Sequence, residues 1–140
     1  MQIYSPSFQT KLSIPLSFVP VQAGFPSPAL DYQDKKIDLN EHIIKHPAST
    51  FFVRVSGDSM VDKGIFQGDL LVVDKSLEPK SGQIVVAILN GEFTLKEFVQ
   101  DAQKKIFLKP ANKNYPQIEI KIEDDFEIWG IVTNVIHSYL

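Results

Sequence analysis

The sequence predicts a mostly β protein, with a compact antiparallel β fold, one or two short helices and an extended N-terminal arm. Seven short runs rich in apolar and β-branched residues follow one another from Phe51 onward, separated by residues typical of turns. Asn90-Gly91 joins two of these runs in the pattern of a two-residue β-hairpin. Five of the nine prolines lie within the first 28 residues, which excludes a regular helix or a central strand there.

A chain of 140 residues has the material for one domain with a core of its own. Its 17 acidic and 14 basic side chains give a net charge of -3. That balance disfavours strong, direct, nonspecific binding of nucleic acid, which needs a concentrated positive field. The absence of cysteine excludes a disulfide scaffold, a thiolate nucleophile and a zinc site built on cysteine.

Apolar runs such as Leu70–Val73 and Ile84–Leu89 are far shorter than the ~18 residues that a membrane span needs. The first 23 residues carry one charge, Lys11, and contain no continuous apolar core, so they do not resemble a secretory signal. We therefore expect a soluble, cytoplasmic protein without membrane association.

The first part of the chain, residues 1–31, is predicted to be an extended arm that lies on a surface and can leave it. Proline stiffens this stretch, yet it is too apolar for an inert linker, since it carries Tyr4, Phe8, Leu12, Ile14, Leu16, Phe18 and Val19. The alternative interpretation is a disordered terminus. Residues 32–140 are then expected to form the β domain.

A short helix is predicted at Asp38–Ile44, because Asp38 and Glu41 resemble a capping box and the apolar residues that follow Asp38 share one face. We expect Pro47 to end it. The predicted strands are Phe51–Ser56, Asp69–Asp74, Gln83–Leu89, Glu92–Val99, Lys105–Lys109, Gln117–Ile122 and Glu127–His137.

The most informative segment is Gly57-Asp58-Ser59-Met60, which follows the first strand of the β domain. Glycine at the end of a strand and the residues Met60–Lys63 predict a sharp turn into a single helical turn. Ser59 would then expose its hydroxyl beside the free backbone N–H groups of Ser59 and Met60, which are donors suited to an oxyanion. The alternative is that Ser59 merely caps the helical turn.

Histidine is the usual base for a serine nucleophile, and the chain has His42, His46 and His137. No acidic residue is placed to orient any of them in a recognisable triad pattern. His42 and His46 are spaced as a metal pair, but no third ligand is evident and a solvated helix face explains them as well. We therefore expect neither a metal site nor a cofactor.

Lysine is the other candidate base. Alternation along the strand Glu92–Val99 places Thr94, Lys96 and Phe98 on one face. Lys96 is therefore either partly buried or directed to solvent from an edge strand. Burial would lower its pKa, and a neutral Lys96 would then take the proton of Ser59.

The order of several motifs is similar to that of the LexA/UmuD family of Ser–Lys self-cleaving proteins. The motifs are Gly57-Asp58-Ser59-Met60, Gly68–Asp74, Gly82–Ala87 and Thr94-Leu95-Lys96, and the resemblance extends from about Val21 to Leu140. It implies that Ser59 is the nucleophile and Lys96 the general base. Ala23-Gly24 in the arm resembles the bond between small residues that these proteins cleave in themselves.

Within this family the chain is similar to the short, UmuD-type members. Only 23 residues precede Gly24, too few for the helix-turn-helix domain of the repressors, and no anchor like that of signal peptidases is visible. The resemblance implies a peptidase-type β fold, a homodimer, activation by a RecA–DNA filament in the SOS response, and a UmuC-type translesion polymerase as partner. Two other interpretations stay open: a β-rich interaction module without catalysis, and a repressor-like regulator that acts on a repressor in trans.

Overall fold

A computed structural model of the chain describes residues 2–6, 13–17, 23–24 and 33–140. The chain divides into two compact units. The larger unit contains Met1–Pro6 and His46–Leu140, and the smaller contains Ser7–Lys45. The first six residues thus belong to the larger unit, whereas the sequence assigned them to the arm.

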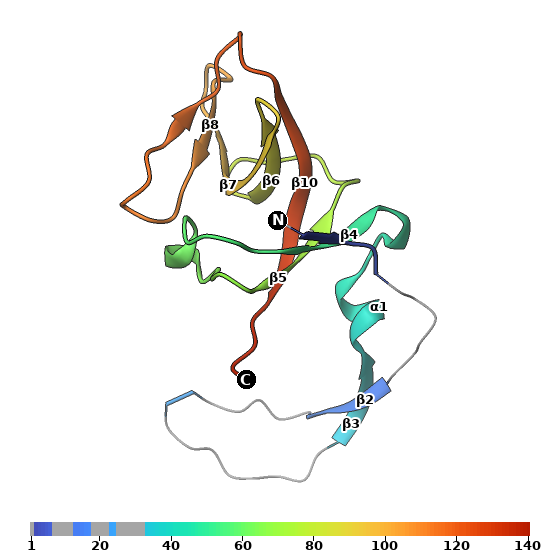
Figure 1. The fold of residues 1–140 in the computed structure, drawn as a ribbon. Coiled ribbons are helices and arrows are strands. Elements are labelled where there is room, and N and C mark those ends of the chain that lie inside the picture. Colours follow the sequence, from blue (N-terminus) through green and yellow to red (C-terminus); the bar gives the residue numbers. More distant parts are fainter. Residues whose placement is uncertain (1, 7–12, 18–22, 25–32) are drawn as a thin grey trace. The chain divides into compact units, whose positions relative to one another are not determined.

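The larger unit is built on one antiparallel sheet of eight strands in the order β1-β4-β5-β10-β6-β7-β8-β9 (Figure 1). This confirms the predicted mostly β fold. The strands are β1 (Gln2–Tyr4), β4 (Thr50–Arg54), β5 (Leu70–Asp74), β6 (Ile84–Leu89), β7 (Glu92–Gln100), β8 (Ile106–Lys109), β9 (Ile118–Glu119) and β10 (Phe126–Ile136).

The predicted hairpin at Asn90-Gly91 is confirmed, because Leu89 and Glu92 are the last paired residues of β6 and β7. Asn90 and Gly91 have φ values of 50° and 83°, and this left-handed conformation is why asparagine and glycine suit a two-residue hairpin turn. The run Gln117–Ile122 forms a shorter strand than predicted. The chain leaves β9 for a turn in which Asp124 accepts a hydrogen bond from the backbone N–H of Lys121, at 2.8 Å.

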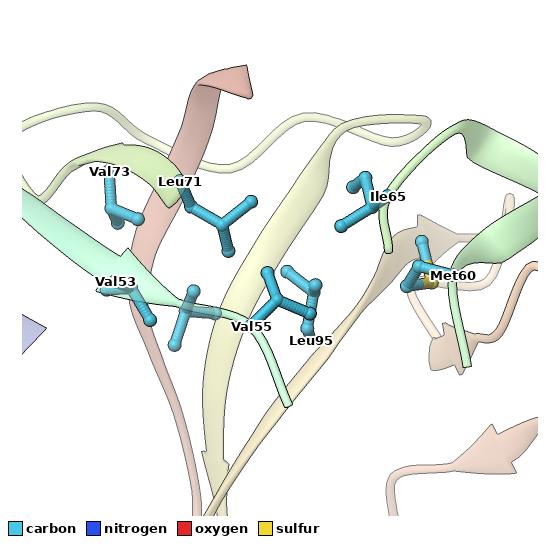
Figure 2. Close-up of a cluster of buried hydrophobic side chains, with 8 residues drawn as sticks. Val53, Val55, Met60, Ile65, Leu71, Val73 and Leu95 are labelled. Atoms are coloured by element: carbon cyan, nitrogen blue, oxygen red, sulfur yellow. The ribbon is translucent and has the colours of Figure 1, made fainter. Parts of the chain in front are cut away.

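The long strand β10, the red strand of Figure 1, holds the sheet together. Its first half pairs with β6 and its second half with β5, and the register shifts once along each pairing. Two apolar clusters form the core of this unit. One contains Val85, Ala87, Phe98, Leu108 and Ile131. The other contains Val53, Val55, Met60, Ile65, Leu71, Val73, Val86 and Leu95, most of which are labelled in Figure 2.

The second cluster matters for the site, because it includes Met60 and Leu95. These two residues, both labelled in Figure 2, adjoin Ser59 and Lys96 in the sequence, and they are only 2% and 8% exposed. A buried side chain in a close-packed core has little freedom to move. The core therefore fixes the backbone directly after Ser59 and directly before Lys96.

Gly130 in β10 is expected to be intolerant of any side chain. A Cβ atom there would lie 2.5 Å from Val73 Cγ1 and 3.3 Å from the carbonyl oxygen of Asp74. Replacing Gly130 by alanine should lower the free energy of unfolding by about 1–3 kcal/mol, the usual cost of overpacking a core. Urea denaturation measures this, with Asn134→Ala at an exposed position of the same strand as the control. Equal urea midpoints for both variants would show that β10 accommodates a Cβ atom at Gly130 without loss of stability.

The smaller unit contains a two-stranded sheet, β2 (Ser13–Ser17) with β3 (Gln33–Asp38), and the helix α1 (Leu39–Ile43). Pro15 is accommodated in β2 because a strand with one partner needs only half of its backbone donors. The predicted helix is present, and Asp38 caps it by accepting a hydrogen bond from the N–H of Asn40 at 3.0 Å. It ends at Ile43, and Pro47 instead begins a short 3-10 helix, Pro47–Ser49.

Strand β1 was not predicted. Gln2, Ile3 and Tyr4 pair with Arg54, Val53 and Phe52 of β4 and thereby extend the sheet at its edge. Ile3 and Tyr4 are 39% and 44% exposed, so this strand contributes little to the core. The remaining arm residues named in the sequence analysis, Phe8, Leu12, Phe18 and Val19, lie outside the described residues. The predicted boundary between residues 31 and 32 stays a prediction.

Candidate active site

Ser59 lies in a sharp turn between β4 and a 3-10 helix, Val61–Lys63, as the sequence predicts. Gly57 has a φ of 89°, a left-handed conformation that side chains disfavour, so glycine lets the chain reverse here. Met60 turns inward to the core, and Ser59 beside it stays half-buried with its hydroxyl in a cavity.

The proposed capping role of Ser59 is not observed. The 3-10 helix is capped at Met60, without any side-chain hydrogen bond to a backbone N–H. The Ser59 hydroxyl instead accepts a hydrogen bond from the amine of Lys96, with Nζ and Oγ 3.3 Å apart. The structure therefore brings together the two side chains that the sequence singled out.

Lys96 lies in β7 just before the stretch that β8 covers, since β8 pairs only with Glu97–Gln100. On the other side, Lys96 pairs with Val85 of β6. Only 9% of Lys96 is exposed. The alternative of a lysine directed to solvent is therefore wrong, because the side chain is buried although β8 does not pair with β7 at this residue.

Two further contacts hold the amine of Lys96. Nζ donates to Thr94 Oγ1 at 2.7 Å and to the carbonyl oxygen of Leu95 at 3.1 Å. A neutral amine has two N–H donors and one lone pair. If the amine is neutral and its two donors stay on Thr94 and Leu95, its lone pair is left for the hydroxyl of Ser59, which then becomes the donor of this hydrogen bond.

Burial lowers the pKa of Lys96 below its ordinary value of 10.5, because the charged amine loses its hydration. No carboxylate hydrogen-bonds to this amine among the residues that the structure describes. The site therefore favours the neutral form more than water does. A neutral amine next to a serine hydroxyl is able to accept its proton.

A cavity of about 150 Å³ opens beside this pair. It is lined by Val55, Ser56, Gly57, Ser59, Met60, Ile65, Phe93, Thr94, Leu95 and Lys96. Its floor is the apolar core, and its polar groups are those of the Ser59 turn and β7. A space of this size admits a small side chain and excludes a large one.

The backbone N–H groups of Ser59 and Met60 belong to residues that line the same cavity. Within the part of the chain that the structure describes, neither donates a hydrogen bond to another group of the protein. Both belong to the turn that forms one wall of the cavity. The role in binding an oxyanion that the sequence analysis gave them stays a prediction.

Ala23 and Gly24, the predicted cleavage site, form an exposed bend in the smaller unit. Gly24 has a φ of 133°, a conformation that residues other than glycine disfavour. The bond between them is thus accessible, and the assignment as the cleaved bond stays a prediction.

Each of two histidines has an aspartate partner that the sequence spacing did not reveal. His46 Nδ1 lies 2.5 Å from Asp74 Oδ2, and His137 contacts Asp69. Two histidines thus have an acidic partner, although neither pair forms a triad with Ser59, which agrees with the expectation that no triad is present. Neither histidine hydrogen-bonds to Ser59, whose hydroxyl is bonded to Lys96. Among residues 2–6, 13–17, 23–24 and 33–140, no group of three potential metal ligands occurs.

Sequence reasoning missed the groups that hold the pair in place. Thr94 was placed on the face of Lys96 without a role, and its hydroxyl is the shortest contact of the amine. Asp58 was part of the motif, but its partners Asn112 and Tyr115 are more than 50 positions away. No spacing rule connects residues so distant in the chain.

No helix in the described part of the chain has the length and apolar character to span a membrane.

Comparison with known proteins agrees with these motifs. The Peptidase S24-like family matches residues 15–133. Protein SamA of Salmonella typhimurium is 47% identical over 116 residues, which are 83% of this chain and 79% of SamA. Protein MucA of Escherichia coli is 44% identical over 123 residues, 87% of this chain and 83% of MucA.

A repressor is also similar. The LexA repressor of Clostridium kluyveri is 38% identical over 119 residues, which are 85% of this chain and 57% of the repressor. The family match covers the Ser59 turn, β7 and most of the sheet. The chain therefore belongs to the Peptidase S24-like family, in agreement with its resemblance to LexA and the UmuD-type proteins.

Proposed function

We propose that this chain is a self-cleaving serine peptidase of the SOS response that uses Ser59 and Lys96 to cut its own Ala23–Gly24 bond. In this proposal a RecA–DNA filament stimulates the cut. The product is the active accessory subunit of the error-prone translesion DNA polymerase V, with a second copy of the chain and a UmuC-type polymerase as partners. The observation that carries the proposal is the 3.3 Å contact between Lys96 Nζ and Ser59 Oγ in a chain of the Peptidase S24-like family.

The first chemical step forms an ester. Ser59 Oγ attacks the carbonyl carbon of Ala23, and its proton passes to the neutral amine of Lys96. The carbonyl oxygen becomes negatively charged and is stabilised by the N–H groups of Ser59 and Met60. The ammonium of Lys96 then gives its proton to the nitrogen of Gly24, and the C–N bond breaks.

The second step releases the arm. A water molecule attacks the ester carbon while Lys96 takes one of its protons. The oxyanion collapses, the bond to Oγ breaks, and Lys96 returns the proton to Oγ. The products are the arm, with a new carboxyl group at Ala23, and the remaining chain, with a new amine at Gly24. The hydroxyl of Ser59 is restored. Lys96 is an acid and a base in turn, which requires a pKa within reach of the working pH.

Stimulation by an activator is compatible with this mechanism. The reaction needs the Ala23–Gly24 bond in the cavity and Lys96 without its proton at the same moment. An activating filament accelerates cleavage if it binds this state more tightly than the others, because it then raises the population of that state. The catalytic groups themselves stay those of the chain, whether the cleaved arm belongs to the same copy or to its partner.

The other interpretations make different predictions. A non-catalytic interaction module has no reason to bury a lysine amine against a serine hydroxyl, since burial of the amine is unfavourable. A repressor-like regulator would bind a repressor rather than a translesion polymerase. A pulldown with each of the two candidate partners separates this last alternative from our proposal.

Cleavage is expected to give a product that starts at Gly24. Mass spectrometry after incubation with a RecA–DNA filament, or at alkaline pH without it, locates the cut. Gly24→Trp should block the reaction, because a large side chain does not fit a cavity of about 150 Å³ beside Ser59. A product that starts at another residue would show that the chain is cleaved at a bond other than Ala23–Gly24. Equal cleavage of Gly24→Trp would show that the bond does not enter this cavity.

The product Gly24–Leu140 should stay folded. It loses β1 and β2, but both apolar clusters of the larger unit remain complete. Its thermal melting should therefore be cooperative. Backbone amides of β4 that face β1 should exchange faster with solvent after cleavage, because the paired strand is no longer linked to the chain.

A further inference from the structure

The loop Pro110–Tyr115, which follows β8, is hydrogen-bonded to the Ser59 turn from one side. The backbone N–H of Ala111 donates to the carbonyl oxygen of Ser59 at 2.8 Å. The N–H of Asp62 donates in return to the carbonyl oxygen of Ala111, also at 2.8 Å. The turn is therefore held by a segment about 50 residues further along the chain.

Two side chains of the same loop add to this contact. Asn112 donates from Nδ2 to the carbonyl oxygen of Asp58 at 2.9 Å. Tyr115 donates from its hydroxyl to Asp58 Oδ1 at 2.5 Å. The loop is itself ordered by Asn112, whose Oδ1 accepts the N–H of Asn114 at 3.0 Å.

The two carbonyl groups held in this way belong to specific peptide units. The carbonyl of Asp58 shares a peptide plane with the N–H of Ser59, and the carbonyl of Ser59 shares one with the N–H of Met60. A trans peptide is planar and its C=O and N–H point in opposite directions. Holding the oxygen on the loop side therefore directs both N–H groups away from the loop.

We propose that Asn112 is a positioning residue for self-cleavage, which orients the N–H of Ser59 toward the reacting carbonyl oxygen, and that Tyr115 supports it by fixing Asp58. This inference rests on the proposed function and adds a role for two residues outside the Ser59–Lys96 pair. Ala111 performs the same task for the N–H of Met60 through its backbone. Each bond also polarises the peptide that it holds, which makes the N–H a better donor.

The hydrogen bond between Tyr115 and Asp58 also affects the titration of Tyr115. The carboxylate of Asp58 accepts a hydrogen bond from the hydroxyl of Tyr115 and raises the pKa of Tyr115 above its ordinary value of 10.0. Tyr115 therefore keeps its proton, and its hydrogen bond to Asp58, to a higher pH than an ordinary tyrosine does.

The test uses Asn112→Asp in the full chain. The aspartate keeps the size of the side chain and the oxygen that accepts the N–H of Asn114, but it cannot donate to the carbonyl of Asp58. The matched control is Asn114→Asp, which adds the same charge two residues away at an exposed position. The first-order rate of self-cleavage is measured against pH without activator, together with the melting temperature of each variant.

Asn112→Asp should cleave about 10- to 100-fold more slowly than Asn114→Asp, since a misdirected donor loses much of its stabilisation of the oxyanion. The plateau of the rate should fall while the midpoint of its pH profile, set by Lys96, stays in place. A purely structural residue would lower the melting temperature and leave the plateau of the folded protein unchanged. Tyr115→Phe, which removes one oxygen atom, should reduce the plateau in the same way by a smaller factor.

The outcomes separate this inference from the proposed function. If Ser59→Ala still cleaves, the proposed function is wrong and the inference falls with it. If Ser59→Ala is inactive and Asn112→Asp cleaves as fast as Asn114→Asp, only the positioning role is wrong. Should Asn112→Asp melt below the assay temperature, Tyr115→Phe decides, and an unchanged plateau in that variant overturns the proposal.

Discussion

Ser59→Ala is expected to abolish self-cleavage and leave the fold intact. Without Oγ no ester forms, so the rate should fall by at least about a thousandfold, to below detection. The fold should tolerate the change, because the hydroxyl contacts the amine of Lys96 and caps no helix. Lys96 keeps its bonds to Thr94 and Leu95, so the expected loss of stability is only about 1 kcal/mol.

The measurement compares the intact chain and the product by mass spectrometry over time, with and without a RecA–DNA filament. Ser138→Ala, at an exposed serine near the C-terminus, is the control and should cleave like the parent. Melting temperatures show that each variant is folded. Undiminished cleavage in folded Ser59→Ala would exclude Ser59 as the nucleophile, whatever the activator does.

The sheet could be predicted from the sequence because its signals are local. Alternation placed Thr94 and Lys96 on one face, and Asn90-Gly91 fixed the hairpin that sets β7 against β6. Such patterns depend on neighbours within a few residues. Strand β1 could not be predicted in this way, because its three residues become a strand only by pairing with β4, about 50 positions away.

The candidate site was predictable in its residues but not in its geometry. The motifs named Ser59 and Lys96, yet the contact between them joins positions 37 apart, and no periodicity measures that distance. The same limit applies to the histidine–aspartate pairs and to Asn112, whose partner is 54 positions away. Contacts of this kind depend on how strands are ordered in the sheet, which the local pattern leaves open.

The pH dependence of cleavage is expected to follow the neutral form of Lys96. Burial lowers the pKa of this amine below 10.5. Below that lowered pKa the neutral fraction grows about tenfold per pH unit, and above it the fraction is nearly constant. The rate without activator should therefore rise with pH and then level off. A rate that stays flat from about pH 6 to about pH 10 would exclude Lys96 as the base.

Variants of Lys96 test whether cleavage needs a side chain that accepts a proton or only a positive charge. Lys96→Arg should be inactive because guanidinium keeps its proton throughout this pH range. Lys96→Met should be inactive too, since it has no group that accepts a proton. Cleavage by either variant, in protein shown to be folded by its melting curve, would require another base.

Stability offers a check on the same lysine that does not involve catalysis. Between the lowered pKa of Lys96 and 10.5, the unfolded chain binds more protons at this residue than the folded chain does. The free energy of unfolding contributed by Lys96 must therefore rise with pH across that window. Lys96→Met removes this contribution, so urea midpoints of the parent and the variant should converge or cross as the pH rises. If the difference between the two urea midpoints is constant over this pH range, the pKa of Lys96 is the same in the folded and unfolded chain. Lys96 would then lack the lowered pKa that its role as a base needs.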